Sequence, residues 1–346
     1  MPEHVSPAAV AEALNRPASQ ATGQSLPEAI SVATADGVRL HVEQHGPADA
    51  PVTVLLLHGW TLDGRTWHRQ VTALRDRYGD TVRVLTYDAR GHGRSGPTTL
   101  RFANLARLGD DLAEVLAAVA PRGPVVLAGH SMGGMTVMEY AHRHPRAFAD
   151  RVAGLVLVST TAEGHTHTGY GVPPVLARLI RLAETAGAGV LARCGARRTP
   201  RPLLMALRPS LRWLLFGDPC DPDDIRLTIS AVARAGLVSI GGFRPSIGAQ
   251  RRLETLAALG DVPAAVLVGD RDRLTPPACA ESIAQVLPTA ELTICPEAGH
   301  MLPLERADLV NTALFAITDR VAAGPGPTSH TITQSRRRLR RTARCP

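Results

Sequence analysis

The stretch Pro124-Val125-Val126-Leu127-Ala128-Gly129-His130-Ser131-Met132-Gly133 decides the fold predicted for this 346-residue chain. Its apolar first half predicts a buried strand, and the amphipathic run over residues 132–144 predicts a helix that Pro145 ends. Ser131 therefore lies at a sharp corner between a strand and a helix. Glycines on both sides of the serine fit this corner, because a residue without a Cβ atom tolerates strained dihedral angles and lets strand and helix pack closely. The pattern makes Ser131 a candidate nucleophile.

Similar strand and helix patterns alternate along the rest of the chain. The predicted strands cover residues 30–33, 38–44, 52–57, 82–87, 125–128, 152–158, 264–268 and 291–294. The predicted helices lie near residues 67–77, 105–120, 132–144, 277–286 and 303–321. The first two strands flank an Asp-Gly turn, which indicates an antiparallel hairpin at the sheet edge. The alternation that follows predicts an α/β fold, with a mostly parallel eight-stranded sheet covered by helices on both faces.

The alternation stops at residues 160–260, where short amphipathic helices are separated by glycine and proline. We expect one domain built from residues 26–159 and 261–323, with the intervening segment inserted as a helical cap. Residues 1–25 and 324–346 have the composition of disordered extensions, and the second of them is basic.

The apolar stretches of the predicted cap are expected to cover the site and to form an aliphatic pocket. They are residues 175–180 and 203–207. Aromatic residues are few in this segment, so a pocket that stacks an aromatic ligand is less favoured. Five arginines interleave with apolar residues in the same segment, namely Arg197, Arg198, Arg201, Arg208 and Arg212. This pattern fits either a weak contact with a membrane surface or arginines that only extend into solvent, and the second reading is the commoner one.

The formal charge of +7 belongs to the end of the chain rather than to the folded part. Six arginines without an intervening acid lie there, namely Arg336, Arg337, Arg338, Arg340, Arg341 and Arg344. Without them the chain is close to neutral, so the composition gives no electrostatic reason to expect a nucleic-acid partner. A basic tail of this kind fits a solvated extension, and a weak contact with an anionic membrane is the alternative.

Several short motifs, in this order, resemble those of the α/β-hydrolase family. They are His58-Gly59, the turn Tyr87-Asp88-Ala89-Arg90-Gly91-His92-Gly93-Arg94-Ser95, the serine corner, Gly269-Asp270-Arg271-Asp272 with Pro276, and Ala298-Gly299-His300. The resemblance covers about residues 30–322. It implies an α/β-hydrolase fold with a helical cap and a catalytic triad of Ser131, Asp272 and His300.

The resemblance also implies a role for each residue of the site. His300 would accept the proton of Ser131, and Asp272 would orient the imidazole. Asp270 competes for that last role, but the family spacing to Pro276 selects Asp272.

The oxyanion formed during acyl transfer also needs hydrogen-bond donors. By the same resemblance, the backbone N–H groups of Trp60 and Met132 would supply them. Four further residues would support the turns of the site, namely His58, Gly59, Gly129 and Gly133.

A serine at the corner, where related dehalogenases and epoxide hydrolases carry aspartate, implies acyl chemistry. The leading hypothesis is a serine hydrolase similar to actinobacterial esterases and lipases, which cleaves a small, apolar carboxylic ester through an acyl-serine intermediate. Thioesters and lysolipids stay open as substrates. A cofactor-free haloperoxidase or perhydrolase, a C–C hydrolase and a ligand receptor that retains the triad stay open as alternatives. The motifs do not separate them, because the cap sets the substrate, and they leave the acyl chain length and the oligomeric state open.

We expect neither a nucleotide cofactor nor a metal. The glycine pattern at residues 91–96 is followed at once by Pro97, so no helix begins inside it as pyrophosphate binding requires. His165 and His167 have only Glu163 near them, which does not complete a metal site. Scattered cysteines without a disulfide pattern, no signal peptide and no long apolar run together predict a cytoplasmic protein.

Overall fold

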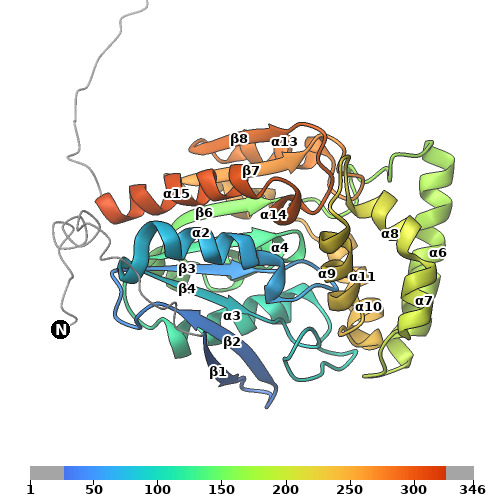
Figure 1. Cartoon of the computed structure of the whole chain (residues 1–346), viewed down its shortest axis with the longest axis horizontal. Coiled ribbons are helices and arrows are strands. Elements are labelled where there is room, and N and C mark those ends of the chain that lie inside the picture. Colours follow the sequence, from blue (N-terminus) through green and yellow to red (C-terminus); the bar gives the residue numbers. More distant parts are fainter. Residues whose placement is uncertain (1–26, 325–346) are drawn as a thin grey trace, which may run out of the picture.

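The computed structural model describes residues 27–324. The extension predicted at residues 1–25 and the tail arginines lie outside these residues. A single eight-stranded sheet forms the centre of the described chain (Figure 1). Its strands are β1 (Glu28–Ala33), β2 (Arg39–His45), β3 (Val52–Leu57), β4 (Val82–Tyr87), β5 (Val125–His130), β6 (Val152–Val158), β7 (Ala264–Gly269) and β8 (Ala290–Cys295).

The strands lie in the order β1-β2-β4-β3-β5-β6-β7-β8. β1 is antiparallel to β2 and β2 is antiparallel to β4, whereas all the other neighbours are parallel. The prediction of a mostly parallel eight-stranded sheet that begins with a hairpin is confirmed. The strands at 52–57, 82–87 and 152–158 have the predicted bounds, and the others differ from prediction by one or two residues at one or both ends.

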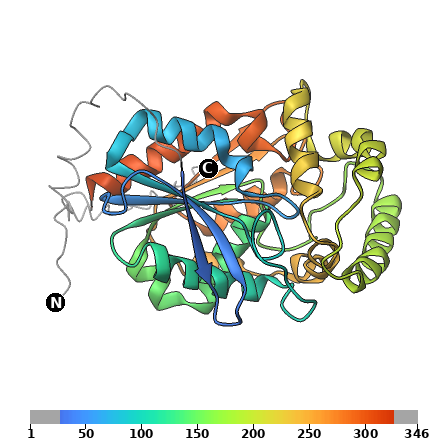
Figure 2. The same cartoon turned by 60° about the horizontal axis from the view of Figure 1, so that its bottom comes forward.

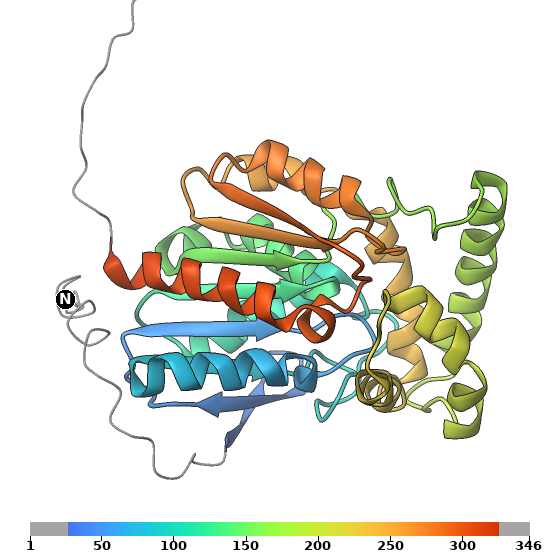
Figure 3. The ribbon, with the colours of Figure 1, turned by 45° about the horizontal axis from the view of Figure 1, so that its top comes forward.

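Helices cover both faces of the sheet. On one face lie α2 (His68–Tyr78) and α15 (Ala307–Ala323), and Figure 3 shows both in front of the strands. On the other face lie α3 (Leu105–Val119), α4 (Met132–Arg143), α5 (Pro145–Arg151) and α13 (Pro277–Val286). Two short 3-10 helices, η1 (Gly64–Trp67) and η2 (Gly79–Thr81), flank α2.

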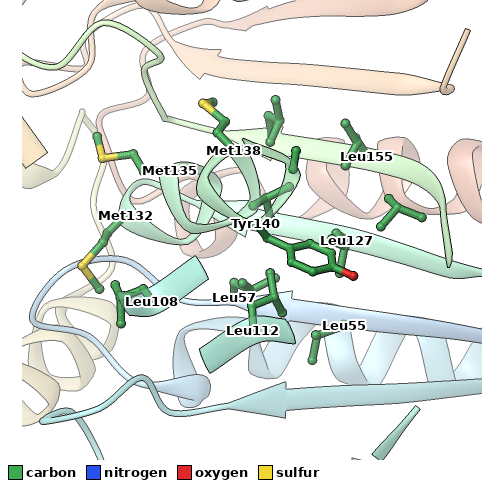
Figure 4. Packing of buried hydrophobic residues seen from close by; sticks show 14 of the residues in the cluster. Leu55, Leu57, Leu108, Leu112, Leu127, Met132, Met135, Met138, Tyr140 and Leu155 are labelled. Atoms are coloured by element: carbon green, nitrogen blue, oxygen red, sulfur yellow. The ribbon is translucent and has the colours of Figure 1, made fainter. Parts of the chain in front are cut away.

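Alternate residues of the central strands enter different cores, as the period of a strand requires. Leu55 and Leu57 of β3 pack with α3 and α4, and Figure 4 shows them beside Leu112. Val54 and Leu56 of the same strand pack in the core under α2 and α15. Because both faces are covered, every residue of β3, β4, β5 and β7 is buried. This is why these strands appear in the sequence as unbroken apolar runs.

One predicted helix was wrong in detail, and one helix of the structure was not predicted. The helix predicted over residues 303–321 is interrupted at Arg306 and forms α14 (Leu302–Glu305) and α15. Pro145 does follow the end of α4, but it also begins α5, which was not predicted. A proline fits the first turn of a helix, because its missing N–H would have no acceptor there.

The chain between β6 and β7 is helical and lies beyond the carboxyl ends of the parallel strands (Figures 1 and 2). Its helices are α6 (Pro174–Arg193), α7 (Arg201–Ala206), α8 (Arg208–Leu215), α9 (Pro222–Val232), α10 (Leu237–Gly242), α11 (Arg244–Ala249) and α12 (Leu253–Ala257). We refer to this segment as the helical insertion. Within residues 27–324, no helix is both long and apolar enough to span a bilayer.

Candidate active site

Ser131 lies between β5 and α4 with a left-handed backbone, φ 52° and ψ −117°. Its N–H donates to the carbonyl of Val158 over 2.9 Å. Its own carbonyl accepts the hydroxyl of Thr160 over 2.7 Å. A positive φ is costly for a residue with a side chain, so these contacts with Val158 at the end of β6 and with Thr160, two residues later, help to hold the corner.

The two glycines beside the serine are required by close packing. A Cβ atom at Gly133 would lie 2.2 Å from the carbonyl oxygen of Leu57 at the end of β3. A Cβ atom at Gly129 would lie 2.5 Å from the amide nitrogen of Gly134. Any side chain at either position would therefore move α4 away from the sheet and displace Ser131.

Asp272 and His300 come from the loops after β7 and β8 and meet in a buried contact. The Nδ1 atom of His300 lies 2.8 Å from Oδ2 of Asp272. The other carboxylate oxygen accepts the backbone N–H groups of Leu274 and Thr275, each over 2.9 Å. The hydroxyl of Thr275 donates to Oδ2 over 2.8 Å. These donors hold the carboxylate in one orientation toward the imidazole.

Thr275 is a residue of the site that sequence reasoning missed. A threonine three residues after an aspartate is a common loop pattern, in which the carboxylate accepts backbone N–H groups of its own turn. That spacing was the available signal. Asp270, the competing acid, is exposed, and its backbone N–H donates to the carbonyl of Cys295.

Two more histidines adjoin the site and make structural contacts. His58 Nδ1 donates to the carbonyl of Gly59 over 2.7 Å, and its Nε2 accepts the backbone N–H of Ala89 over 2.9 Å. His130 Nε2 donates to the carbonyl of His300 over 2.8 Å. Burial lowers the pKa of His130 to about 3, and the nearby His300 contributes to the same shift. His130 is therefore neutral near pH 7.

Ser131, His300, Trp60 and Met132 all line one cavity of about 470 Å³. Within residues 27–324, the backbone N–H groups of Trp60 and Met132 donate to no protein acceptor. Two unpaired N–H groups beside a serine are the kind of donors that can bind a negatively charged oxygen. Asp272 is bonded to His300 but does not itself line this cavity.

Most of the remaining lining is aliphatic and comes from the helical insertion. Leu203, Leu204 and Leu207 contribute to it, as predicted for the stretch 203–207. The prediction for residues 175–180 was wrong, because none of them lines the cavity and several are exposed. The sequence pattern marked both stretches as apolar but did not indicate which one faces inward.

A polar group interrupts the aliphatic lining. Arg244 donates to the carboxylate of Glu184 and, over 2.8 Å, to the hydroxyl of Tyr170. Tyr170 donates to Glu184 over 2.7 Å. His165 contacts the same guanidinium, and its burial, together with the Arg244 charge, lowers the pKa of this histidine to about 4. From the sequence, His165 and His167 are considered as candidate metal ligands, and this cluster, which joins α6 to α11, is not predicted.

Comparison with known proteins gives the family. The profile of the alpha/beta hydrolase family matches residues 54–313. The chain therefore belongs to the α/β hydrolase family, and its similarity to hydrolases and esterases supports hydrolase activity. In residues 27–324, no group of three or more His, Cys, Asp or Glu side chains could hold a metal ion.

Individual relatives match over most of their length. A protein of Variovorax paradoxus (strain S110) named "Putative carbamate hydrolase RutD" is 30% identical over 83% of this chain and 98% of its own. The pimeloyl-acyl-carrier-protein methyl ester esterase of Chromobacterium violaceum is 30% identical over 71% of this chain and 86% of its own. The structure of a thermophilic esterase from Thermogutta terrifontis has a TM-score of 0.67 and 25% identity, and the match covers 86% of this chain and 100% of that one.

Proposed function

We propose that this protein is a serine hydrolase that cleaves carboxylic esters with an apolar acyl group through an acyl-serine intermediate. The observation that carries the proposal is the meeting of Ser131, His300 and two unpaired backbone N–H groups in one cavity, with His300 bonded to Asp272. The ester and carbamate hydrolases among the relatives support it.

In this mechanism, the Oγ atom of Ser131 attacks the ester carbonyl carbon while Nε2 of His300 takes its proton. Nε2 is the nitrogen left for the serine, because Nδ1 is bonded to Asp272. The tetrahedral oxyanion accepts the N–H groups of Trp60 and Met132, and the loss of one such donor typically costs about 3 kcal/mol. The carbon–oxygen bond to the alcohol then breaks, and His300 returns the proton to the leaving oxygen. Water attacks the acyl-serine in the same way and releases the acid.

The helical insertion would act as a cap that selects the acyl group. Each methylene group transferred from water to an aliphatic lining contributes about 0.8 kcal/mol. A cavity of about 470 Å³ lined by leucines therefore favours acyl chains of several carbons over acetyl. We assign the catalytic domain to residues 26–159 and 261–323, and the cap to residues 160–260.

A second candidate is hydrolysis of a carbamate, which the similarity to the RutD protein favours. The carbonyl of a carbamate would use the same nucleophile and the same oxyanion donors. The size of the substrate distinguishes the ester from the carbamate, because a simple carbamate fills little of the aliphatic cavity.

A fluorophosphonate probe tests the proposal, because it reacts with an activated serine. We expect the wild-type protein to be labelled, Ser131→Ala to be unlabelled and Ser210→Ala to be labelled like the wild type. Ser210 is an exposed serine of α8 and serves as the matched control. A wild-type protein that stays unlabelled while it binds an ester would instead indicate a receptor.

A panel of p-nitrophenyl esters of increasing acyl length, with a p-nitrophenyl carbamate beside it, then identifies the substrate class. We expect turnover to rise from acetyl to longer chains and to be lost in Ser131→Ala and His300→Ala. Faster turnover of the carbamate than of every ester would favour the second candidate.

A further inference from the structure

The long helix α6 fully buries only alanines and leaves five of its large apolar residues exposed, namely Val175, Leu176, Leu179, Leu182 and Val190. Its buried side chains are Ala177, Ala188 and Ala192. Ala188 and Ala192 pack against α10, where a Cβ atom at Gly241 would lie 2.2 Å from the carbonyl oxygen of Ala188 and 2.6 Å from the amide nitrogen of Ala192. An amphipathic helix that is stabilised only by its own domain has the opposite arrangement, with the large apolar residues inward.

The exposed apolar residues of α6 form a stripe along one face. Val175, Leu179, Leu182, Ala186 and Val190 follow one another at intervals of four, three, four and four residues, which places them on one side of a helix. Leu182 is 67% exposed and Val190 is 63% exposed. A continuous apolar stripe of this length on a surface helix indicates a binding surface rather than scattered exposed residues.

The apolar surface continues onto the next two helices. Leu203, Met205 and Leu207 of the α7 region and Trp213 of α8 are also exposed. Figures 1 and 3 place α6 and α7 at the end of the molecule opposite the C-terminal end of α15. We call this surface the apolar cap face, and its residues are Val175, Leu176, Leu179, Leu182, Val190, Leu203, Met205, Leu207 and Trp213.

The charge around the apolar cap face is almost entirely positive. Residues 172–216 contain one acid, Glu184, which is bonded to Arg244. The same segment contains eight arginines, namely Arg178, Arg181, Arg193, Arg197, Arg198, Arg201, Arg208 and Arg212. Arg212 pairs with Asp218 over 2.7 Å, and in the part of the chain that the structure describes the other seven form no ion pair.

We propose that the apolar cap face binds peripherally to the surface of an anionic lipid membrane. Apolar side chains would enter the region between headgroups and acyl chains, and the unpaired arginines would contact lipid phosphates. A second copy of this chain fits less well, because its cap face would bring further arginines and no free carboxylate to meet them. An acidic protein would match the charge but would not by itself explain the exposed leucines.

The candidate cavity opens on the same surface. Leu203 and Leu207 both line the cavity and are exposed, so they lie at its rim. An apolar molecule dissolved in the membrane could then enter the cavity without crossing water. The membrane contact itself is independent of the proposed ester hydrolysis, so each can fail without the other.

Sedimentation of the full-length chain with vesicles tests the proposal. We would compare vesicles of phosphatidylcholine alone with vesicles that contain equal parts of phosphatidylcholine and phosphatidylglycerol. The test variant combines Leu179→Ser with Leu182→Ser. The matched control combines Leu292→Ser with Ile294→Ser, which are also exposed but lie on β8. All variants keep the basic tail, so its contribution is the same in each.

We expect the wild type and the β8 control to bind the anionic vesicles, and the α6 variant to bind at least tenfold more weakly. A second variant, Arg197→Gln with Arg201→Gln, should bind about thirtyfold more weakly, since one arginine near an anionic surface contributes about 1 kcal/mol.

Equal binding by the wild type and the α6 variant would overturn the proposal. The proposal would also be overturned if the wild type did not bind vesicles but formed a dimer in size-exclusion chromatography, and if the α6 variant did not form this dimer. Equal melting temperatures would show that the exposed substitutions leave the fold intact.

Discussion

At the scale of single residues, hydrogen bonds distinguish two aspartates that the sequence places two positions apart. Asp272 is buried and bonded to His300, to Thr275 and to two backbone N–H groups. Asp270 is exposed, and within residues 27–324 only its backbone N–H forms a hydrogen bond, which it donates to the carbonyl of Cys295 on β8. The first arrangement can orient an imidazole, and the second cannot.

We therefore expect Asp272→Asn to lower kcat by a thousandfold or more, and Asp270→Asn to change it by about twofold or less. An asparagine amide can donate toward Nδ1 of His300 and so favours the tautomer with its proton on the wrong nitrogen, a change that costs about 10⁴ in other serine hydrolases. Steady-state kinetics on a p-nitrophenyl ester would measure both effects. Losses of similar size in the two variants would contradict the assignment of the acid.

At the scale of elements, a buried arginine ties three segments together. The Arg90 guanidinium is fully buried in the turn after β4. It donates to both carboxylate oxygens of Asp111 in α3, over 2.6 and 2.7 Å. It also donates to Asp36 in the first hairpin, over 2.8 and 3.0 Å, and this contact holds the pKa of Asp36 well below its usual range. The turn, α3 and the hairpin are thereby fixed relative to one another.

Arg90→Met should lower the free energy of unfolding by about 3 kcal/mol, because among the described residues it leaves the buried carboxylate of Asp111 with only Arg107 as a charged partner. The matched control is Arg94→Met in the same turn. Arg94 is 57% exposed and pairs with Glu43, so its loss should cost less than about 1 kcal/mol. Urea unfolding would give both values, and equal costs would show that burial of the ion pair is not the deciding factor.

At the scale of the whole molecule, acid sensitivity follows from buried neutral histidines. Burial lowers the pKa values of His92 and His130 to about 3 each. In the unfolded chain, both have the ordinary value of about 6.5. As the pH falls below 6.5, the unfolded chain binds protons at these sites and the folded protein does not, so the free energy of unfolding decreases.

Between pH 8 and pH 5, each of these histidines should lower the free energy of unfolding by about 2 kcal/mol. Urea unfolding of the wild type at the two pH values, beside His92→Gln, isolates the contribution of one of them. We expect the decrease to be about 2 kcal/mol smaller in the variant. An unchanged pH dependence would mean that the pKa of His92 is the same in the folded and the unfolded protein.

Much of the fold and part of the candidate site could be predicted from the sequence alone. The parallel strands are buried on both faces, so each appears as an unbroken apolar run with turn residues at its ends. The corner at Ser131 could be predicted because glycines lie on both sides of the serine, at positions 129 and 133. The structure has no room for a Cβ atom at either position. These features depend on local spacing, which a sequence records directly.

The tertiary structure alone decided which face of α6 points outward, how Thr275 holds Asp272 and how Arg244 meets Glu184 inside the cavity. The apolar period of α6 was visible in the sequence, but its direction depends on a close approach to Gly241, about fifty residues further along the chain. A local pattern states that a helix has an apolar side. Only contacts between residues far apart in the sequence determine whether that side faces the core, a cavity or the surroundings of the protein.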